Sequence, residues 1–330
     1  MKRTFVFIAL AALLLTTSCV SSGSKSSSEV TDATPQKKEA PKRGGWYEDS
    51  LYGNVESVTI IKYEPAEKFG KVVKDKIKEK TTYKFNLKGD VIEIAKYDSD
   101  DSLNGKDLFK YDSNGNEIES NCYNSNGLLD HKTLYKYDSQ GNMIEMAECN
   151  SDGSIGRKWF YKYDSNGNKI ECDCYNRDGC SLDAKLLYKY DSQGNKIERN
   201  VYESNGALQS KDMYKYDSQG NMIEVARYIG DSLLYHKDTY TYDSQGNMIE
   251  VASWYNDWFY EDCSINVKGL YKYDSQGNRI EMASYNRDSS LSYKYIYEYD
   301  SQGNLIEKTY YKGEIMEPNW MEERIIVYRK

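Results

Sequence analysis

The sequence is poor in the residues that most often perform catalysis or break regular structure. Its 330 residues include four prolines, three of them before residue 66, and only two histidines, His131 and His236. Each histidine precedes a strand-like segment and recurs in no other repeat, so we interpret both as surface residues rather than catalytic bases. Motifs of serine hydrolases, zinc peptidases, phosphate-binding loops and dinucleotide-binding folds are absent. We therefore expect no enzyme, no catalytic residue and no cofactor.

A basic surface and long apolar runs are also missing. The 44 basic and 52 acidic residues give a net charge of -8, which argues against a nucleic-acid partner. One apolar run, Phe5–Leu15, is too short to span a bilayer. Lys2 and Arg3 precede this run, and Thr and Ser residues then lead into Cys19. This pattern predicts a secretion signal.

Residues 1–19 resemble a bacterial lipoprotein signal peptide, in which Cys19 receives the lipid and becomes the new N-terminus. Thr16 stands where that family usually has leucine, so the alternative is ordinary signal cleavage with Cys19 a free thiol. Residues 20–45 consist largely of Ser, Lys, Pro, Thr and Gly, a composition typical of a disordered tether. We expect a lipid anchor in the outer membrane and a position in the cell envelope outside the cytoplasm.

The cysteines beyond Cys19 occupy no common position in the repeats described below. An even number of them in an oxidising compartment is compatible with disulfides, but their irregular placement argues against a regular framework. Cys172 and Cys174 are two residues apart on one expected strand, too far from each other for an easy bridge. No histidine and no C-x2-C spacing accompanies them, so we expect no metal site. The six are Cys122, Cys149, Cys172, Cys174, Cys180 and Cys263.

Tyrosine is abundant, with 33 residues, because the motif Tyr-Lys-Tyr-Asp-Ser-Gln-Gly-Asn-Met-Ile-Glu and its close variants recur nine times. The motif glycines are 26 residues apart, with one interval of 27 and one of 31. Such a period is typical of proteins whose repeats bury their apolar faces by stacking on neighbours. The glycines are Gly89, Gly115, Gly141, Gly167, Gly194, Gly220, Gly246, Gly277 and Gly303.

Each motif predicts a β-hairpin. Asn-Gly at this site in two repeats favours a two-residue type I′ turn. Centring that turn on Gln140-Gly141 places Lys136 opposite Glu145, and the same ion pair is expected in six further repeats, where it fixes the register. The final repeat departs from this with Glu298 opposite Glu307. The other face of the hairpin is expected to hold Tyr135, Tyr137, Ile144 and Met146.

A second turn about half a period later, as at Asn126-Gly127 and Asp152-Gly153, makes each repeat two antiparallel strands. Turn spacings of 12 and 14 residues shift successive hairpins by two residues. At about 3.3 Å per residue and about 4.8 Å between strands, this shift tilts the strands by about 35°. The expected fold is all-β: an antiparallel meander of nine two-stranded YDxxGN repeats over 83–307, forming a coiled or rolled sheet, either open or closed on itself.

The segments that flank the repeats also read as strands. Residues 46–82 are expected to form an N-terminal β cap with an edge strand over Val55–Tyr63, and residues 308–330 a closing strand. Lysines between Lys68 and Lys80 form either a solvated, edge-protecting face or a basic docking stripe.

The motif core, Tyr111-Asp112-Ser113-Asn114-Gly115-Asn116 and its copies, resembles the YD repeats of RHS-type and teneurin-like proteins. That resemblance implies strands that wind into a spiral shell. We do not extend the resemblance to the toxin-delivery role of that family, because the repeat period is long for the family and the chain is short. The sequence also resembles small bacterial lipoproteins with the same YDxxGN motif.

Function is expected where the repeat is interrupted. The 31-residue interval contains Trp254, Tyr255, Trp258, Phe259 and Tyr260, whose aromatic rings suit a sugar or a protein surface. The leading hypothesis is a non-enzymatic envelope module that binds a glycan or a protein. The alternatives are an enzyme that processes envelope glycans or peptides with carboxylates in the sheet, and a purely structural spacer.

Overall fold

The computed structural model describes residues 51–69, 71–176, 181–255, 265–313 and 317–329. Ala40–Lys330 form one compact unit, whose described residues contain twenty β-strands and no helix. No helix in these ranges is therefore long and apolar enough to cross a membrane. The strands are β1 (Val55–Lys68), β2 (Lys71–Phe85), β3 (Val91–Asp98), β4 (Leu103–Tyr111), β5 (Glu117–Asn124), β6 (Leu129–Tyr137), β7 (Met143–Asn150), β8 (Ile155–Tyr163), β9 (Lys169–Tyr175), β10 (Leu182–Tyr190), β11 (Lys196–Glu203), β12 (Leu208–Tyr216), β13 (Met222–Ile229), β14 (Leu233–Tyr242), β15 (Met248–Tyr255), β16 (Ile265–Tyr273), β17 (Arg279–Asn286), β18 (Leu291–Tyr299), β19 (Leu305–Lys312) and β20 (Pro318–Tyr328).

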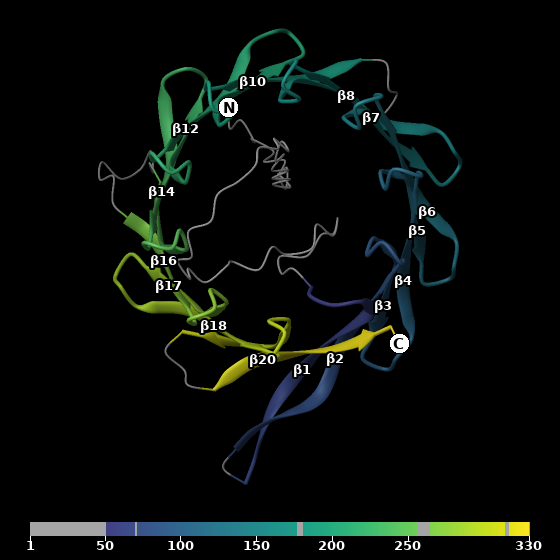
Figure 1. Cartoon of the computed structure of the whole chain (residues 1–330), viewed down its shortest axis with the longest axis vertical. Coiled ribbons are helices and arrows are strands. Elements are labelled where there is room, and N and C mark those ends of the chain that lie inside the picture. The colour runs from purple at the N-terminus through teal and green to yellow at the C-terminus, as the bar shows by residue number, and fades with distance from the viewer. Residues whose placement is uncertain (1–50, 70, 177–180, 256–264, 314–316, 330) are drawn as a thin grey trace, which may run out of the picture. The chain divides into compact units, whose positions relative to one another are not determined.

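The strands form one closed antiparallel sheet. Each strand pairs with the next along the chain, and β1 pairs with β20 as well as with β2, which the strand order around Figure 1 follows. The all-β, antiparallel class is confirmed, and of the two arrangements left open the sheet adopts the closed one. The expected edge strand over Val55–Tyr63 is wrong, because β1 has a neighbour on both sides. Lys80 of β2 also has strand neighbours on both sides, whereas the β2 lysines before Glu79 lie where β2 pairs with β1 alone.

The pairing has the two-residue stagger expected from the turn spacing. Met146 pairs with Tyr135 on one side and with Trp159 on the other. The residue equivalent to Tyr135 in the next repeat is Tyr161, not Trp159. The paired positions therefore shift by two residues from one repeat to the next. A constant stagger of this kind lets a sheet of tilted strands close.

The motif turn is not the expected type I′ turn. The N–H of Gly141 donates to Asp138 O (3.1 Å) and that of Asp138 to Asn142 O (2.9 Å), and φ is positive at Gly141 alone among these residues. This is a type I turn followed by a glycine bulge. Asp138 Oδ1 accepts hydrogen bonds from the N–H groups of Gln140 and Asn142, and Asn142 Nδ2 donates to Asp138 Oδ2. The Asp-x-x-Gly-Asn core is thus a self-capped turn, and the second type of turn has the same backbone hydrogen bonds.

The bulge corrects one expected set of contacts. Lys136 pairs with Glu145 as expected, but Tyr137 pairs with Met143 rather than Ile144. Ile144 lies beside Met143 in the bulge and is exposed. We call the side that holds Tyr135 and Met146 the tyrosine face and the opposite side the lysine–glutamate face.

All seven expected Lys–Glu ion pairs form on the lysine–glutamate face. Their Nζ–Oε distances lie between 2.7 and 2.8 Å. In the final repeat Glu298 lies opposite Glu307, and Glu307 pairs instead with Lys74 of β2. The pairs are Lys84–Glu93, Lys110–Glu119, Lys136–Glu145, Lys162–Glu171, Lys189–Glu198, Lys215–Glu224 and Lys272–Glu281.

The tyrosine that precedes the motif aspartate links adjacent repeats. The hydroxyl of Tyr137 donates to Glu117 O at 2.8 Å, and that of Tyr163 donates to Met143 O at 2.8 Å. The acceptor is always the carbonyl at or next to the start of the strand that follows the preceding motif turn, which explains why this tyrosine is part of the motif. The same hydrogen bond is made by Tyr111, Tyr190, Tyr216, Tyr242, Tyr273 and Tyr299.

A buried hydrophobic cluster lies on the first three strands, and Ile326 and Tyr328 of the last strand pack against it. Leu51, Val55, Val58, Phe85 and Val91 form one buried cluster. Beside this cluster, Asn304, which is fully buried, binds both polar groups of the Tyr52 backbone. The residues before β1 therefore help to hold the closing strands together.

The described cysteines form no disulfide. Cys122, Cys149, Cys172 and Cys174 are free thiols, and the Sγ atoms of Cys172 and Cys174 are 3.8 Å apart on one face of β9. Cys180 and Cys263 lie outside the described residues.

Candidate functional site

A cluster of polar side chains interrupts the tyrosine face across β12 to β15. Two residues before the first motif aromatic residue, β8, β10 and β18 carry Trp159, Leu186 and Tyr295, whereas β4, β12 and β14 carry Asp107, Asp212 and Asp238. Strand pairing places Asp212 opposite Arg227 and Asp238 opposite Ser253. The register of the repeat thus gathers unusual charged residues on one face.

Asp238 is the centre of this cluster. Its side chain is buried, with 6% of the residue exposed. Arg227 Nη1 lies 2.8 Å from Asp238 Oδ2, and Ser253 Oγ donates to Asp238 Oδ1 at 2.7 Å. A second pair, Arg199 and Asp212, lies beside it at 3.3 Å. Buried carboxylates require such partners, so these contacts hold the arginines in fixed positions.

His236 connects the charged cluster to an exposed aromatic ring. Its Nδ1 accepts a hydrogen bond from Arg227 Nη1, and its Nε2 lies 2.9 Å from Asp238 Oδ1 without hydrogen-bond geometry. Burial lowers the pKa of His236 despite the nearby Asp238, so the ring is neutral at neutral pH. The ring of Tyr255 stacks on it with centroids 4.3 Å apart and planes 8° apart, and Tyr255 is 45% exposed.

The aromatic residues expected to form a site do not all lie on one surface. Tyr255 pairs with His236 on the tyrosine face, whereas Trp254 pairs with Lys237 and points to the lysine–glutamate face. These two rings therefore cannot contact one ligand on the same side of the sheet. Trp258, Phe259, Tyr260 and the lipid-acceptor candidate Cys19 lie outside the described residues.

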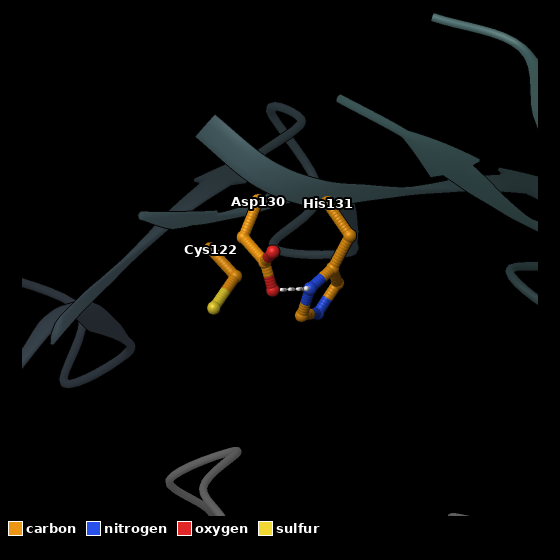
Figure 2. Close-up of side chains that lie close together, drawn as sticks. All are labelled: Cys122, Asp130 and His131. Atoms are coloured by element: carbon orange, nitrogen blue, oxygen red, sulfur yellow. Dashed lines mark hydrogen bonds and ion pairs between the residues drawn. The ribbon is translucent and has the colours of Figure 1, made fainter. Parts of the chain in front are cut away.

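A second group of potential ligand atoms lies on β5 and β6. Cys122 pairs with His131 across the hairpin, and Figure 2 shows Asp130 between them. One ligand atom from each residue lies within 4.8 Å of the others, and His131 Nδ1 is 3.1 Å from Asp130 Oδ2. The turn at Asn126-Gly127 already implied the pairing of Cys122 with His131. The sequence therefore contained this signal, which is missed when the two residues are considered one at a time.

This second group fits a metal ion poorly. Three side chains leave one tetrahedral position of zinc without a protein ligand, and those of Asp130 and His131 are 65% and 54% exposed. Burial, together with a hydrogen bond to Asp107, raises the pKa of the Cys122 thiol to about 11. Without a metal ion, the thiol is therefore protonated at neutral pH.

The described residues also line two open depressions. One of ≈ 370 Å³ lies beside His131 and includes Glu148 and Arg157. Another of ≈ 450 Å³ includes the turn residues Asp274 and Asp300 together with Glu298. Asp274 and Asp300 occupy the repeated turn position and are occupied with capping their own turns. Apart from the aspartates of the repeated turns, the carboxylate that lines the first depression is Glu148 and the one that lines the second is Glu298.

The fold and its repeats define a class of protein, a shell of antiparallel hairpins linked by Tyr-Asp turns. The sequence matches the family model of the teneurin YD-shell over residues 32–227, more than half of the chain. The chain therefore belongs to the teneurin YD-shell family. This membership confirms the resemblance to RHS and YD repeats and supports a role as a structural shell or scaffold module.

Several solved structures are similar to this chain. A crystal structure of TcdB2-TccC3 shares 13% identity with a TM-score of 0.40 and covers 76% of the chain. A second, without the hypervariable C-terminal region, gives the same identity and TM-score over 78%. This chain spans 15% of the length of either. A porin-like protein from Bacteroides uniformis ATCC 8492 shares 9% identity with a TM-score of 0.34, over 83% of this chain and 98% of that one. No curated protein sequence matches.

Proposed function

We propose that this protein is a non-enzymatic scaffold of the cell envelope that binds a glycan on the tyrosine face between β12 and β15. The observation that carries the proposal is the stacked pair of Tyr255 and His236, fixed in place by Arg227 and Asp238. A sugar ring stacks on an exposed aromatic ring, and nearby fixed hydrogen-bond donors orient its hydroxyl groups. Because the donors are held by buried ion pairs, little ordering entropy is lost on binding.

The repeat makes this site a local exception. Elsewhere on the tyrosine face the rings of neighbouring repeats contact one another, as Tyr295, Tyr310 and Trp320 do. Tyr255 instead ends β15, next to the long interval of the repeat, and stacks on a neutral imidazole. Its exposed ring area is the feature that packing within the shell does not explain.

Glycan binding is tested with the purified chain on an array of envelope polysaccharides, followed by titration of any ligand found. Tyr255→Ala is expected to weaken binding roughly tenfold, because it removes the stacking ring. The matched control is Tyr285→Ala, since Tyr285 pairs with Lys268 on the lysine–glutamate face of the sheet. Equal binding by both variants and the unchanged chain, or no bound glycan, favours a pure spacer or a protein ligand instead.

We also propose attachment to the membrane through a lipid on Cys19, on the basis of the basic residues, the apolar run and the cysteine in residues 1–19. Cells fed an alkyne-tagged fatty acid are expected to label the unchanged chain and to leave Cys19→Ser unlabelled, and the variant is expected to leave the membrane fraction. Labelling that survives this substitution contradicts the assignment.

A further inference from the structure

The hairpin of β1 and β2 extends beyond the closed sheet. β1 pairs with β20 only as far as Tyr63, and β2 pairs with β3 only from Glu79 onward. Residues 64–68 and 71–78 therefore pair only with each other, and Figure 1 shows this ribbon leading away from the other strands. Lys74 of this ribbon binds Glu307 and Glu323 of the closing strands, but the residues at the tip pair only with each other, so the tip calls for another explanation.

The tip presents a bulky aromatic ring in an unfavourable backbone conformation. Lys68 pairs with Lys71, so only Phe69 and Gly70 connect the strands. Phe69 has φ of 56°, in the left-handed region where Asn is enriched and a bulky residue is a rare outlier. Its side chain is fully exposed, at 105% of the reference area. Backbone strain at an exposed residue points to a function for that residue.

Charge around the tip is equally unfavourable for the isolated chain. Lys68 and Lys71 face each other directly, and like charges in that position destabilise a hairpin. Lys68 has Asp75 as an ion-pair partner, whereas exposed Lys71, Lys76 and Lys78 lie within 4.0 Å of no carboxylate in the described part of the chain. An acidic protein thus concentrates basic side chains beside the most exposed phenylalanine of its described residues.

We propose that this tip, Phe69 between Lys68 and Lys71, inserts into the surface of an anionic lipid bilayer. A convex tip of two residues cannot bury the ~800 Å² per partner that a stable protein interface needs. A bilayer has no such requirement, because one aromatic ring enters the headgroup boundary while each nearby lysine is attracted to anionic lipid. The inference rests on the proposed function in that an anchor at Cys19 would hold the hairpin close to the membrane, where weak insertion suffices.

The test is co-sedimentation of the unacylated chain from Val20 to Lys330 with vesicles. This chain omits the apolar leader and keeps the whole compact unit. One set of vesicles is pure phosphatidylcholine, and the other contains about a third phosphatidylglycerol. The unchanged chain is expected to bind the anionic vesicles in a salt-sensitive manner, and Phe69→Asn is expected to weaken that binding about tenfold.

Phe69→Asn separates this role from a structural one, because Asn tolerates the positive φ at this position and should leave the midpoint of thermal unfolding unchanged or raise it. Lys71→Gln is expected to weaken binding to anionic vesicles alone. The matched control is Leu128→Asn, since Leu128 is another exposed apolar residue at a hairpin turn, 65% exposed. Its binding is expected to equal that of the unchanged chain.

Equal binding by Phe69→Asn and the unchanged chain overturns the inference, as does equal binding to both kinds of vesicle. Capture of an envelope protein by a photo-cross-linker at position 69, with vesicle binding unaffected by Phe69→Asn, assigns the tip to a protein pocket instead and also overturns it. Because the tested chain lacks Cys19, these results do not depend on acylation, and a failure of acylation is seen separately in the fatty-acid labelling.

Discussion

Lys74 Nζ of β2 lies 2.7 Å from Glu307 Oε2 of β19 and 3.1 Å from Glu323 Oε1 of β20. One side chain from the beginning of the chain thus neutralises two carboxylates from its end. Burial lowers the pKa of Lys74, but its hydrogen bonds to the two glutamates outweigh burial and raise it above the ordinary value. In the last repeat, Glu298 stands opposite Glu307 where other repeats have lysine. Lys74 of β2 provides the cation for Glu307 instead.

Lys74→Met is expected to lower the free energy of unfolding by ~2 kcal/mol, between the values for exposed and buried ion pairs, because it leaves Glu307 and Glu323 without their shared cation. Urea denaturation measures the change. Lys136→Met is the control, since Lys136 makes a regular pair with Glu145 and its side chain is 66% exposed. An equal loss from both variants contradicts a special role for Lys74.

Tyr163→Phe is expected to cost ~1 kcal/mol of unfolding free energy, because the hydroxyl bond to Met143 O is lost and the carbonyl is left without that donor. Tyr161→Phe, in the same strand, keeps its ring on the tyrosine face and is expected to cost less. Burial raises the pKa of Tyr163 to about 12, which fits a hydroxyl held in a protected hydrogen bond. Identical denaturation curves for the two variants would show that the link between repeats contributes nothing.

Asn304→Ala is expected to destabilise the protein by ~2 kcal/mol, since it leaves partly buried backbone groups of Tyr52 without their partner and also removes the bond to the Tyr328 hydroxyl. Asn142→Ala removes the same motif position from an ordinary repeat, where the side chain bonds only to its own turn. The ratio of the two effects, measured by thermal or urea unfolding, reports the contribution of Asn304 to closure. A larger effect at Asn142 contradicts this.

Acid is expected to destabilise the sheet through the cross-strand ion pairs. Hydrogen bonds from Lys110 and Asn121 hold the pKa of Glu119 at about 2, against an ordinary value of 4.5. A carboxyl whose pKa is depressed by folding stabilises the folded state above pH 4.5, and that stabilisation is lost as the pH falls toward 2. Glu119→Gln should therefore be less stable than the unchanged chain at pH 7, and the difference should shrink at pH 3. A difference that is constant with pH would contradict the coupling.

The sequence predicted the repeated parts of this fold better than the exceptions. The Lys–Glu pairs, such as Lys136 with Glu145, follow from strand alternation about the turn. The two-residue stagger follows from the spacing of the turns. The predicted turn type was wrong because the side chain of Asp138 caps the turn and one positive φ is sufficient, so Tyr137 pairs with Met143 rather than Ile144. Closure depends on Asn304, Lys74 and Tyr52, whose contacts span about 230 residues or more and leave no local signal.

The candidate site was only partly visible in the sequence. The long interval directed attention to Tyr255, yet its partners Arg227, His236 and Asp238 come from two other strands and were identified only by register. Aspartates where some other repeats carry Trp159, Leu186 or Tyr295 were the available signal. Trp254 shows the opposite error, because proximity in sequence suggested a shared surface that strand alternation forbids.

Pairing of β1 with β20 closes the sheet, and the roles of Lys74 and Asn304 depend on it. Amide-to-amide nuclear Overhauser contacts in a deuterated sample test this pairing directly, for example between residues of the paired segments around Thr59 and Ile325. The closed sheet predicts contacts along Val58 to Tyr63 with Met321 to Ile326, as strong as those within any hairpin of the repeats. Contacts within every hairpin together with none between β1 and β20 would mean an open, coiled sheet and would contradict closure.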